Sequence, residues 1–252
     1  MVSAGLLGCG NIGHIIAKLR GDIEICALFD VLHERADMLA QITNGTAYRD
    51  FSELLTSDCS LIIEAASVEA VHMFAKEVLL NGKDLVIMSV GALSDEIFYR
   101  ELLELAHLKG RKIYIPSGAI FGLDNLKVGM ISRIDSVLLK TTKGPGSLKL
   151  DSDDKKLIFK GKARECIKGF PKNMNVSVAL GLACGIEPDV ELWVDPAAEK
   201  NVHEIFVSGE FGEAYIKVQN NPSPDNPSTS YLAALSVITL LTQIDSPIII
   251  GT

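Results

Sequence analysis

A glycine-rich turn near the start of the chain carries the first residues that could do chemistry. Gly8, Gly10 and Gly13 have the spacing GxGxxG, with Asn11 and Ile12 inside the motif. In such a turn the first glycine permits the tight bend, the second lets the backbone approach a pyrophosphate, and the third allows close helix–strand packing. The free N–H groups at the start of the following helix can then bind phosphate.

An acidic residue follows this turn at a distance typical of ribose binding. Asp30 comes 20 residues after Gly10, at the end of the second expected strand, where a carboxylate accepts hydrogen bonds from the adenosine ribose. The order strand, turn, helix, strand and acid predicts a dinucleotide site. Asp30 would repel a 2′-phosphate, which favours NAD. Arg35 lies close enough to accommodate that phosphate, so NADP stays open, although a solvated helix residue is the simpler interpretation of Arg35.

One histidine stands apart from the other four. His14, His33, His72 and His107 fall on expected helices of the first half, where they are most simply helix-face residues. His203 lies alone in the second half, on an expected strand. A side chain with a pKa of about 6.5 can accept and donate protons near neutral pH, as a catalytic acid or base does. A structural histidine on a half-buried strand is an equal interpretation at this point.

The first half of the chain alternates short apolar runs with segments of helical periodicity. Strands are expected at 3–7, 23–29, 61–65, 85–88 and 112–115, and helices at 11–20, 31–42, 68–80 and 95–108. Strands that alternate with helices of about ten residues indicate a doubly wound parallel sheet, the Rossmann fold of the α/β class.

After Pro116 the pattern changes to consecutive strands. They are expected at 136–143, 156–160, 189–194, 202–208 and 214–219, with helices at 123–131 and 175–183. This order predicts a second, α+β domain built on an antiparallel sheet.

The domains and the end of the chain follow from these patterns. We expect a dinucleotide-binding domain at 1–117, a substrate domain at 118–227, and a C-terminal segment, 228–252, that rejoins the first domain. Within this last part, 220–228 reads as a loop, 231–241 as a helix and 248–250 as a final strand.

The bulk composition excludes several classes of protein. The 252 residues are 48% hydrophobic and 22% charged, as in ordinary globular proteins, and the net charge of -8 argues against nucleic-acid or anionic-membrane partners. No window approaches the ~20 apolar residues of a membrane span, and no signal peptide precedes the first strand. The five cysteines form no CxxC pair, and no cluster has metal-ligand spacing. We therefore expect a cytoplasmic protein without a metal.

Six segments together resemble L-aspartate dehydrogenase. In that family's order they are EAAS at 64–67, SVGA at 89–92, SGAIFGLD at 117–124, FPKNMNV at 170–176, NVHEI at 201–205 and NPSTSYL at 226–232. Together with the glycine-rich turn, these segments are distributed over nearly the whole chain. The last three are far more specific than GxGxxG. The resemblance implies NAD(P)-dependent oxidation of L-aspartate to iminoaspartate, which hydrolyses to oxaloacetate and ammonia. It also implies that iminoaspartate feeds NAD biosynthesis.

The resemblance also assigns roles to individual residues. It makes His203 catalytic and places Ala119 and Asn175 against the nicotinamide, with Ala66 and Ser67 as further cofactor contacts. The sequence departs from the family at Phe121, where the pattern SGAIGGLD has glycine, so the shape of the pocket there is left open.

A substrate with two carboxylates needs hydrogen-bond donors. By residue type we expect them at Ser117, Gly118, Asn173, Thr141 and Thr142. Lys143 is a further candidate, but an exposed loop lysine before Gly144-Pro145-Gly146 is at least as good an interpretation. The chain has no lysine in the Glu-Lys-Pro setting of sugar-oxidising relatives, which argues against a polyol substrate.

Two other functions remain as alternatives. The same fold reduces small carbonyls or imines in homoserine dehydrogenase and dihydrodipicolinate reductase, and an NAD-sensing module could lack catalysis altogether. His203 in its motif weighs against the sensing module, and a choice by fold alone is not possible. By analogy with other sheets of this kind, we also expect a homodimer formed through the exposed face of the second sheet.

Overall fold

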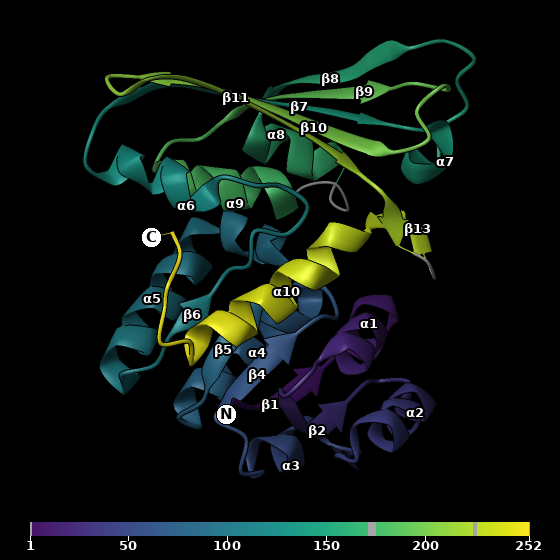
Figure 1. Ribbon diagram of the computed structural model, residues 1–252, viewed down its shortest axis with the longest axis vertical. Coiled ribbons are helices and arrows are strands. Elements are labelled where there is room, and N and C mark those ends of the chain that lie inside the picture. The colour runs from purple at the N-terminus through teal and green to yellow at the C-terminus, as the bar shows by residue number, and fades with distance from the viewer. Residues whose placement is uncertain (1, 171–174, 224–225, 252) are drawn as a thin grey trace. The chain divides into compact units, whose positions relative to one another are not determined.

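The computed structural model describes residues 2–170, 175–223 and 226–251. It forms two compact units. Unit 1 comprises Met1–Pro116 and Ala234–Ile249, and unit 2 comprises Ser117–Ala233 and Ile250–Thr252. Each unit has its own sheet (Figure 1). Each also has its own hydrophobic core.

The sheet of unit 1 is parallel throughout, as the sequence predicts. Its strand order is β3-β2-β1-β4-β5-β6. The strands are β1 (Ser3–Leu7), β2 (Glu24–Phe29), β3 (Thr46–Ala47), β4 (Leu61–Glu64), β5 (Asp84–Ile87) and β6 (Ile113–Tyr114). The order reverses at β1, between β2 and β4. In such folds ligands bind at the carboxyl ends of the strands at this reversal.

Helices connect these strands in the expected alternation. They are α1 (Asn11–Leu19), α2 (His33–Thr43), α3 (Phe51–Leu55), α4 (Val68–Leu80) and α5 (Glu96–Lys109), with a 3₁₀ helix at Val90–Ser94. The core joins Leu6 and Ile63 of the sheet to Ile16 of α1. Val237 and Leu241 of α10 (Tyr231–Ile244) belong to the same core. Helix α10 thus contributes to the core of unit 1.

Unit 2 is built on a mixed five-stranded sheet with the order β11-β10-β7-β9-β8. Its strands are β7 (Ile134–Lys143), β8 (Lys156–Lys162), β9 (Asp189–Val194), β10 (Asn201–Gly209) and β11 (Gly212–Asn220). The Rossmann and α+β classes are both confirmed, but the expected antiparallel sheet has one parallel pair, β7 with β9. This pair is parallel because the chain crosses over through β8 and three helices of the described residues before it forms β9.

The helices of unit 2 cover one face of its sheet (Figure 1). They are α6 (Leu123–Leu126), α7 (Pro145–Leu148), α8 (Ala163–Gly169) and α9 (Asn175–Cys184), with a 3₁₀ turn at Lys127–Met130. Leu126, Cys166 and Leu180 from three of these helices pack against Leu139 and Ile205 of the sheet. The inner face of the sheet is therefore apolar where these helices cover it.

Two expectations for the last thirty residues are wrong. The loop expected at 220–228 contains strands β12 (Pro222–Ser223) and β13 (Asn226–Ser230), which pair antiparallel. Prolines are compatible with this two-stranded ribbon because a strand without a second neighbour has N–H positions that need no partner. The residues at 248–250 form no strand, although the structure describes them, and their side chains are 70–86% exposed.

None of the helices in the described parts of the chain has both the length and the apolar character needed to cross a membrane.

Candidate functional site

The three glycines of the turn in unit 1 differ in what surrounds them. Gly8 has φ +99, and a Cβ there would lie 2.7 Å from the carbonyl of Ala65. At Gly13 a Cβ would lie 2.3 Å from the carbonyl oxygen of Gly8. At Gly10 it would meet only Nη1 of Arg35, at 3.9 Å. Packing inside the protein therefore excludes a side chain at two positions, while the space at Gly10 is open to a ligand.

Asp30 holds this turn against the end of β2. Its carboxylate is buried and accepts a hydrogen bond from the Cys9 N–H at 2.7 Å and another from the Leu32 N–H at 2.8 Å. Each carboxylate oxygen has a second lone pair, so both can still accept a bond from a ribose hydroxyl. Asp30 thus fixes the local backbone and retains acceptor capacity toward the pocket.

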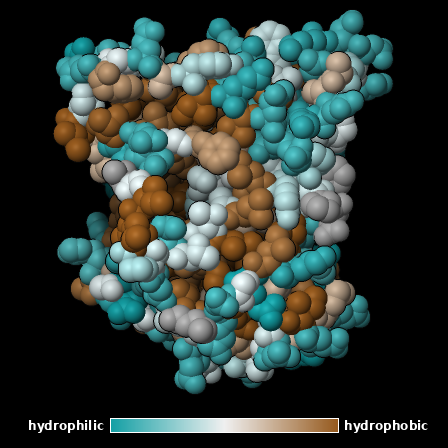
Figure 2. Space-filling model, viewed as in Figure 1, coloured by the Kyte–Doolittle hydropathy of each residue, from teal (hydrophilic) through white to brown (hydrophobic). Residues whose placement is uncertain are grey.

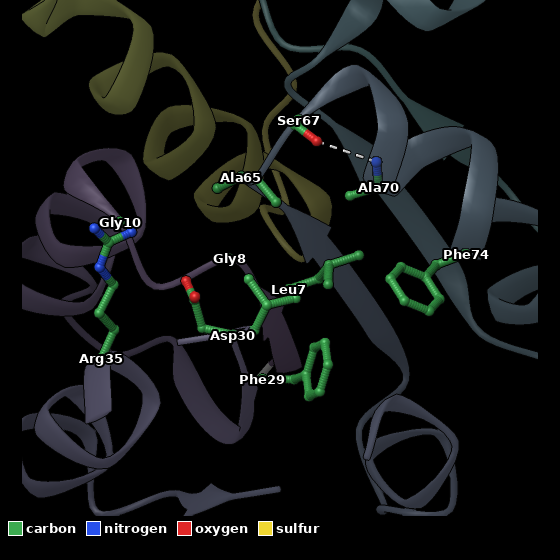
Figure 3. Close-up of a pocket in the computed structure, with 12 residues that line it drawn as sticks. Leu7, Gly8, Gly10, Phe29, Asp30, Arg35, Ala65, Ser67, Ala70 and Phe74 are labelled. Atoms are coloured by element: carbon green, nitrogen blue, oxygen red, sulfur yellow. Dashed lines mark hydrogen bonds between the residues drawn. The ribbon is translucent and has the colours of Figure 1, made fainter. Parts of the chain in front are cut away.

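A pocket opens over these residues at the carboxyl ends of β1, β2 and β4 (Figure 3). Five of the residues expected to bind the cofactor line it, namely Gly8, Gly10, Asp30, Ala66 and Ser67. The hydroxyl of Ser67 also accepts a bond from the Ala70 N–H and so begins α4. Asn11, Ile12 and Gly13 form the first turn of α1. Their position matches the phosphate-binding end of a helix.

Arg35 also belongs to this pocket. Figure 3 shows its guanidinium extending toward Gly10, across from the Asp30 carboxylate. The sequence favours a solvated helix residue at this position, and the side chain is indeed exposed, but it lines the pocket. On the other side, the rings of Phe29 and Phe74 lie 6.1 Å apart, edge to face, and form an apolar wall.

Glu64 is a residue of this region for which the sequence analysis predicts no role. It is 1% exposed at the end of β4, and its carboxylate accepts four hydrogen bonds, from the N–H groups of Ala66, Met88 and Ser89 and from the Ser89 hydroxyl. Burial raises the pKa of Glu64, and these donors act in the opposite direction. The carboxylate ties the loops after β4 and β5 together. The only sign of Glu64 in the sequence is that a single acidic residue follows the apolar residues Leu-Ile-Ile at the end of the strand.

In unit 2, His203 lies on the inner face of the sheet, on β10. It is 3% exposed, and its Nδ1 lies 3.0 Å from Oγ1 of Thr141, directly opposite on β7. Burial, followed by the charge of Lys143, lowers the pKa of His203 to about 3. The expectation of a histidine that titrates near neutrality is therefore wrong for the free protein, because the ring is buried.

The inner face of this sheet becomes polar toward the end that carries His203. Alternate residues of a strand share a face, so Lys143 follows Thr141 on this side of β7, while Asn201 and Asn220 flank His203 on β10 and β11. All five of these side chains are buried. We call this group the polar end: Thr141, Lys143, Asn201, His203 and Asn220.

Lys143 departs most from the sequence-based interpretation. An exposed loop lysine was an equal alternative, but Lys143 ends β7, is only 8% exposed, and pairs with Val194 of β9. Burial lowers its pKa to about 8. Thr142 is also buried, at 6%, but it alternates to the other face of the sheet from His203.

The other expected substrate and nicotinamide contacts are only partly brought together. The carbonyl of Ala119 accepts a hydrogen bond from Nδ2 of Asn220 at 2.9 Å, which connects Ala119 to the polar end. Ser117 and Gly118 directly precede it, and Gly118 has φ +63. Asn175 is the first residue of α9. Asn173 lies outside the described residues, and Phe121 is 56% exposed.

Within the described residues, no group of three or more His, Cys, Asp or Glu side chains could hold a metal ion. The described residues of the site offer a nucleotide pocket and a buried cluster of neutral side chains with one imidazole and one ammonium.

Comparisons with known proteins agree over both units. The family model described as aspartate dehydrogenase, C-terminal, matches residues 124–244, and the homoserine dehydrogenase NAD-binding domain model matches residues 8–116. The L-aspartate dehydrogenase of Methanospirillum hungatei is 59% identical, and that of Methanothermobacter thermautotrophicus is 43% identical. These alignments cover all of this chain and 100% and 99% of the relatives. The crystal structure of aspartate dehydrogenase from Thermotoga maritima matches with a TM-score of 0.85 at 30% identity, over 100% of both chains.

Proposed function

The chain belongs to the aspartate dehydrogenase family, and from this premise we propose that it is an NAD(P)-dependent L-aspartate dehydrogenase. The observation that carries the proposal is the 59% identity with an L-aspartate dehydrogenase, over an alignment that spans the whole chain and therefore both the nucleotide pocket and the polar end. The overall reaction converts L-aspartate, NAD(P)⁺ and water into oxaloacetate, ammonium, NAD(P)H and a proton.

The pocket of unit 1 fits a dinucleotide. Gly10 leaves open space where an added Cβ would touch almost nothing, and α1 begins there with backbone N–H groups suited to phosphate. Asp30 would accept hydrogen bonds from the ribose hydroxyls. Arg35 would supply a positive charge for the 2′-phosphate of NADP. When bound, the cofactor supplies the acceptor for the hydride that leaves Cα of the substrate with its electron pair.

The polar end of unit 2 supplies the proton chemistry. Once the hydride has left Cα, water adds to the resulting imine carbon, a proton leaves that water, and ammonia departs as the C–N bond breaks. We propose that His203 accepts the proton that leaves this water. Its Nδ1 faces the Thr141 hydroxyl, which leaves Nε2 to take the proton. The low pKa of His203 keeps the ring neutral in the free protein.

The remaining expected residues have supporting roles in this proposal. Ala119 and Asn175 would contact the nicotinamide, and Ser117 and Gly118 would donate to the carboxylates of the substrate. The bond from Asn220 to the Ala119 carbonyl supports this arrangement, because it links the nicotinamide contact to the strand next to His203.

An absorbance assay at the reduced-cofactor band tests the proposal. Purified protein should reduce NAD⁺ or NADP⁺ with L-aspartate, and should oxidise the reduced cofactor with oxaloacetate and ammonium. Aspartate semialdehyde and dihydrodipicolinate are the controls for the alternative reductase functions. Turnover of either control without turnover of aspartate would refute the assignment.

We also propose that the chain forms a homodimer through the outer face of the unit 2 sheet. On this face Phe206 and Tyr215 are 40% and 54% exposed, and their rings lie 4.7 Å apart. Hydrophilic side chains gather along the outer edge of the unit (Figure 2). The strands of this sheet also carry the ion pairs Lys140–Glu204 and Lys160–Glu191. Light scattering should show a dimer that Phe206→Glu converts to a monomer, and a wild-type monomer would contradict this. A cytoplasmic location stays a prediction.

A further inference from the structure

Two lysines, Lys83 and Lys143, are buried in the described part of the chain. Lys83 of unit 1 donates its ammonium hydrogens to the carbonyls of Ser57 at 2.7 Å and Cys59 at 2.6 Å, so it connects two segments of backbone. Lys143 of unit 2 instead lies at the polar end, beside the residue assigned to proton transfer. Lys143 therefore lies on the same face of the sheet as the groups assigned to the chemistry.

The place of Lys143 in the sheet fixes its relation to His203. Thr141 pairs with His203 across β7 and β10 and contacts its ring, and Lys143 is the next residue of β7 on the same face. The charge of Lys143 acts on His203 strongly enough to lower its pKa. The two side chains therefore share one environment.

The charges of the other residues at the polar end indicate what Lys143 can bind. Thr141, Asn201 and Asn220 are neutral, and His203 is neutral at physiological pH. Lys143 is thus the one cation of this group. A substrate with two carboxylates brings negative charge to the site, and an ammonium in a buried, low-dielectric place binds a carboxylate more strongly than an exposed one does.

Building on the proposed function, we propose that Lys143 binds a carboxylate group of the substrate. This contact also couples binding to proton transfer. A carboxylate beside the ammonium offsets the positive charge that disfavours protonation of His203. The imidazole then becomes a better base only when substrate is present.

The test compares Lys143→Met and Lys143→Arg with wild type. Loss of a charge-assisted contact should raise the KM for L-aspartate about 10- to 100-fold in Lys143→Met. The inhibition constant of succinate, a dicarboxylate that cannot react, should rise by a similar factor. Lys143→Arg keeps the charge and should recover much of both. Lys140→Met, on the same strand but the opposite face, is the matched control and should keep the wild-type KM.

Stability provides the readout that separates binding from packing. Melting curves should show that Lys143→Met is folded at the assay temperature, so that a raised KM reports lost binding and not lost packing. L-Asparagine, tested as a competitor, distinguishes the two carboxylates. If Lys143 binds the α-carboxylate, Lys143→Met should weaken the binding of aspartate and of asparagine alike. If it binds the side-chain carboxylate, the variant should weaken the binding of aspartate alone.

Three results are decisive against the inference or its premise. A wild-type protein that does not turn over aspartate would refute the proposed function itself. With an active wild type, a Lys143→Met variant that keeps its KM and succinate inhibition but loses kcat would make Lys143 a proton carrier. A folded variant with all constants unchanged would remove Lys143 from the site.

Discussion

The glycine turn of unit 1 and the polar end of unit 2 place chemical groups in opposite ways. In the turn, the groups that meet a ligand are backbone atoms of consecutive residues, and the side chains are absent because Gly8 and Gly13 have no room for them. At the polar end, the groups are side chains from three strands, with Thr141, His203 and Asn220 far apart in the sequence. A contiguous site is therefore visible as a motif, whereas a site assembled by strand pairing depends on the register of the sheet.

The largest expected effect tests whether the polar end does chemistry. His203→Asn should lower kcat by roughly 10²–10⁴, because the amide cannot take the proton from water. The cofactor affinity and the melting temperature should change little, since the asparagine can still bond to Thr141. Thr141→Val is the companion variant and should lower kcat much less, because it removes the hydrogen-bond partner of the His203 ring but keeps the ring itself.

Measurements of kcat, cofactor affinity and melting temperature on one preparation distinguish a catalytic role of His203 from a packing role. If His203 only packs in the sheet, the variant should lose stability while its folded fraction keeps a normal kcat.

The second prediction tests whether the turn of unit 1 is a cradle for phosphate or only a bend. Gly10→Ala adds a Cβ that meets nothing closer than 3.9 Å, so the free protein should keep its melting temperature. The methyl group would occupy the space open to the pyrophosphate, and NAD affinity should fall tenfold or more, which is about 1.4 kcal/mol.

Gly13→Ala is the matched control for a structural glycine. Its Cβ would lie 2.3 Å from the Gly8 carbonyl oxygen, so the melting temperature itself should fall. Calorimetry for stability and titration for NAD affinity separate the two variants. An unchanged NAD affinity in Gly10→Ala would mean that the pyrophosphate binds elsewhere.

The contrast between the two regions also explains what the sequence could predict about the fold. Period-based reasoning places β1, α4 and β9 at the residues where the structure has them. It misses α3 and α8, which have five and seven residues, because elements this short show too few repeats of the helical period. The ribbon of β12 and β13 is missed because its prolines indicate a loop.

The same limit applies to single site residues. Asp30 could be predicted because strand order and spacing place it, but its bonds to the Cys9 and Leu32 N–H groups could not. Lys143 precedes Gly-Pro-Gly, which suggests a loop, and its burial follows only from the neighbouring strands β9 and β10. The low pKa of His203 follows from the same burial, which one sequence does not reveal.

A third prediction concerns the choice between the two cofactors. Asp30→Ser removes an acceptor for the ribose hydroxyls and the repulsion of a 2′-phosphate, so NAD affinity should fall about tenfold while NADP affinity falls less or rises. Because Asp30 also binds two backbone N–H groups, some loss of stability should accompany the change.

Arg35→Ala should act in the opposite direction. Its guanidinium is exposed, so NADP affinity should fall only a few-fold, with NAD affinity nearly unchanged. The ratio of the two dissociation constants is the measurement. A ratio that stays constant in both variants would place the adenosine ribose outside this pocket.

The smallest effect is a pH dependence of stability that belongs to the polar end alone. His203 has a pKa of about 3 in the folded protein, against about 6.5 in an unfolded chain. Between these values the unfolded state holds the extra proton, so the free energy of unfolding must fall as the pH decreases. The slope from this one group approaches, at most, about 1.4 kcal/mol per pH unit.

Comparison with His203→Asn isolates this contribution. Acidic groups such as Glu191 and Asp195, whose pKa values are lowered by ion pairs and hydrogen bonds, also reduce stability in acid, but they do so equally in both proteins. Lys143 stays charged in both states below pH 7 and adds no slope in this range. In denaturant titrations from pH 7.5 to about pH 4.5, the variant should therefore gain stability relative to wild type as the pH falls. A difference independent of pH would show that the ring is not sheltered, and Lys143 would then lie beside a histidine that solvent can protonate.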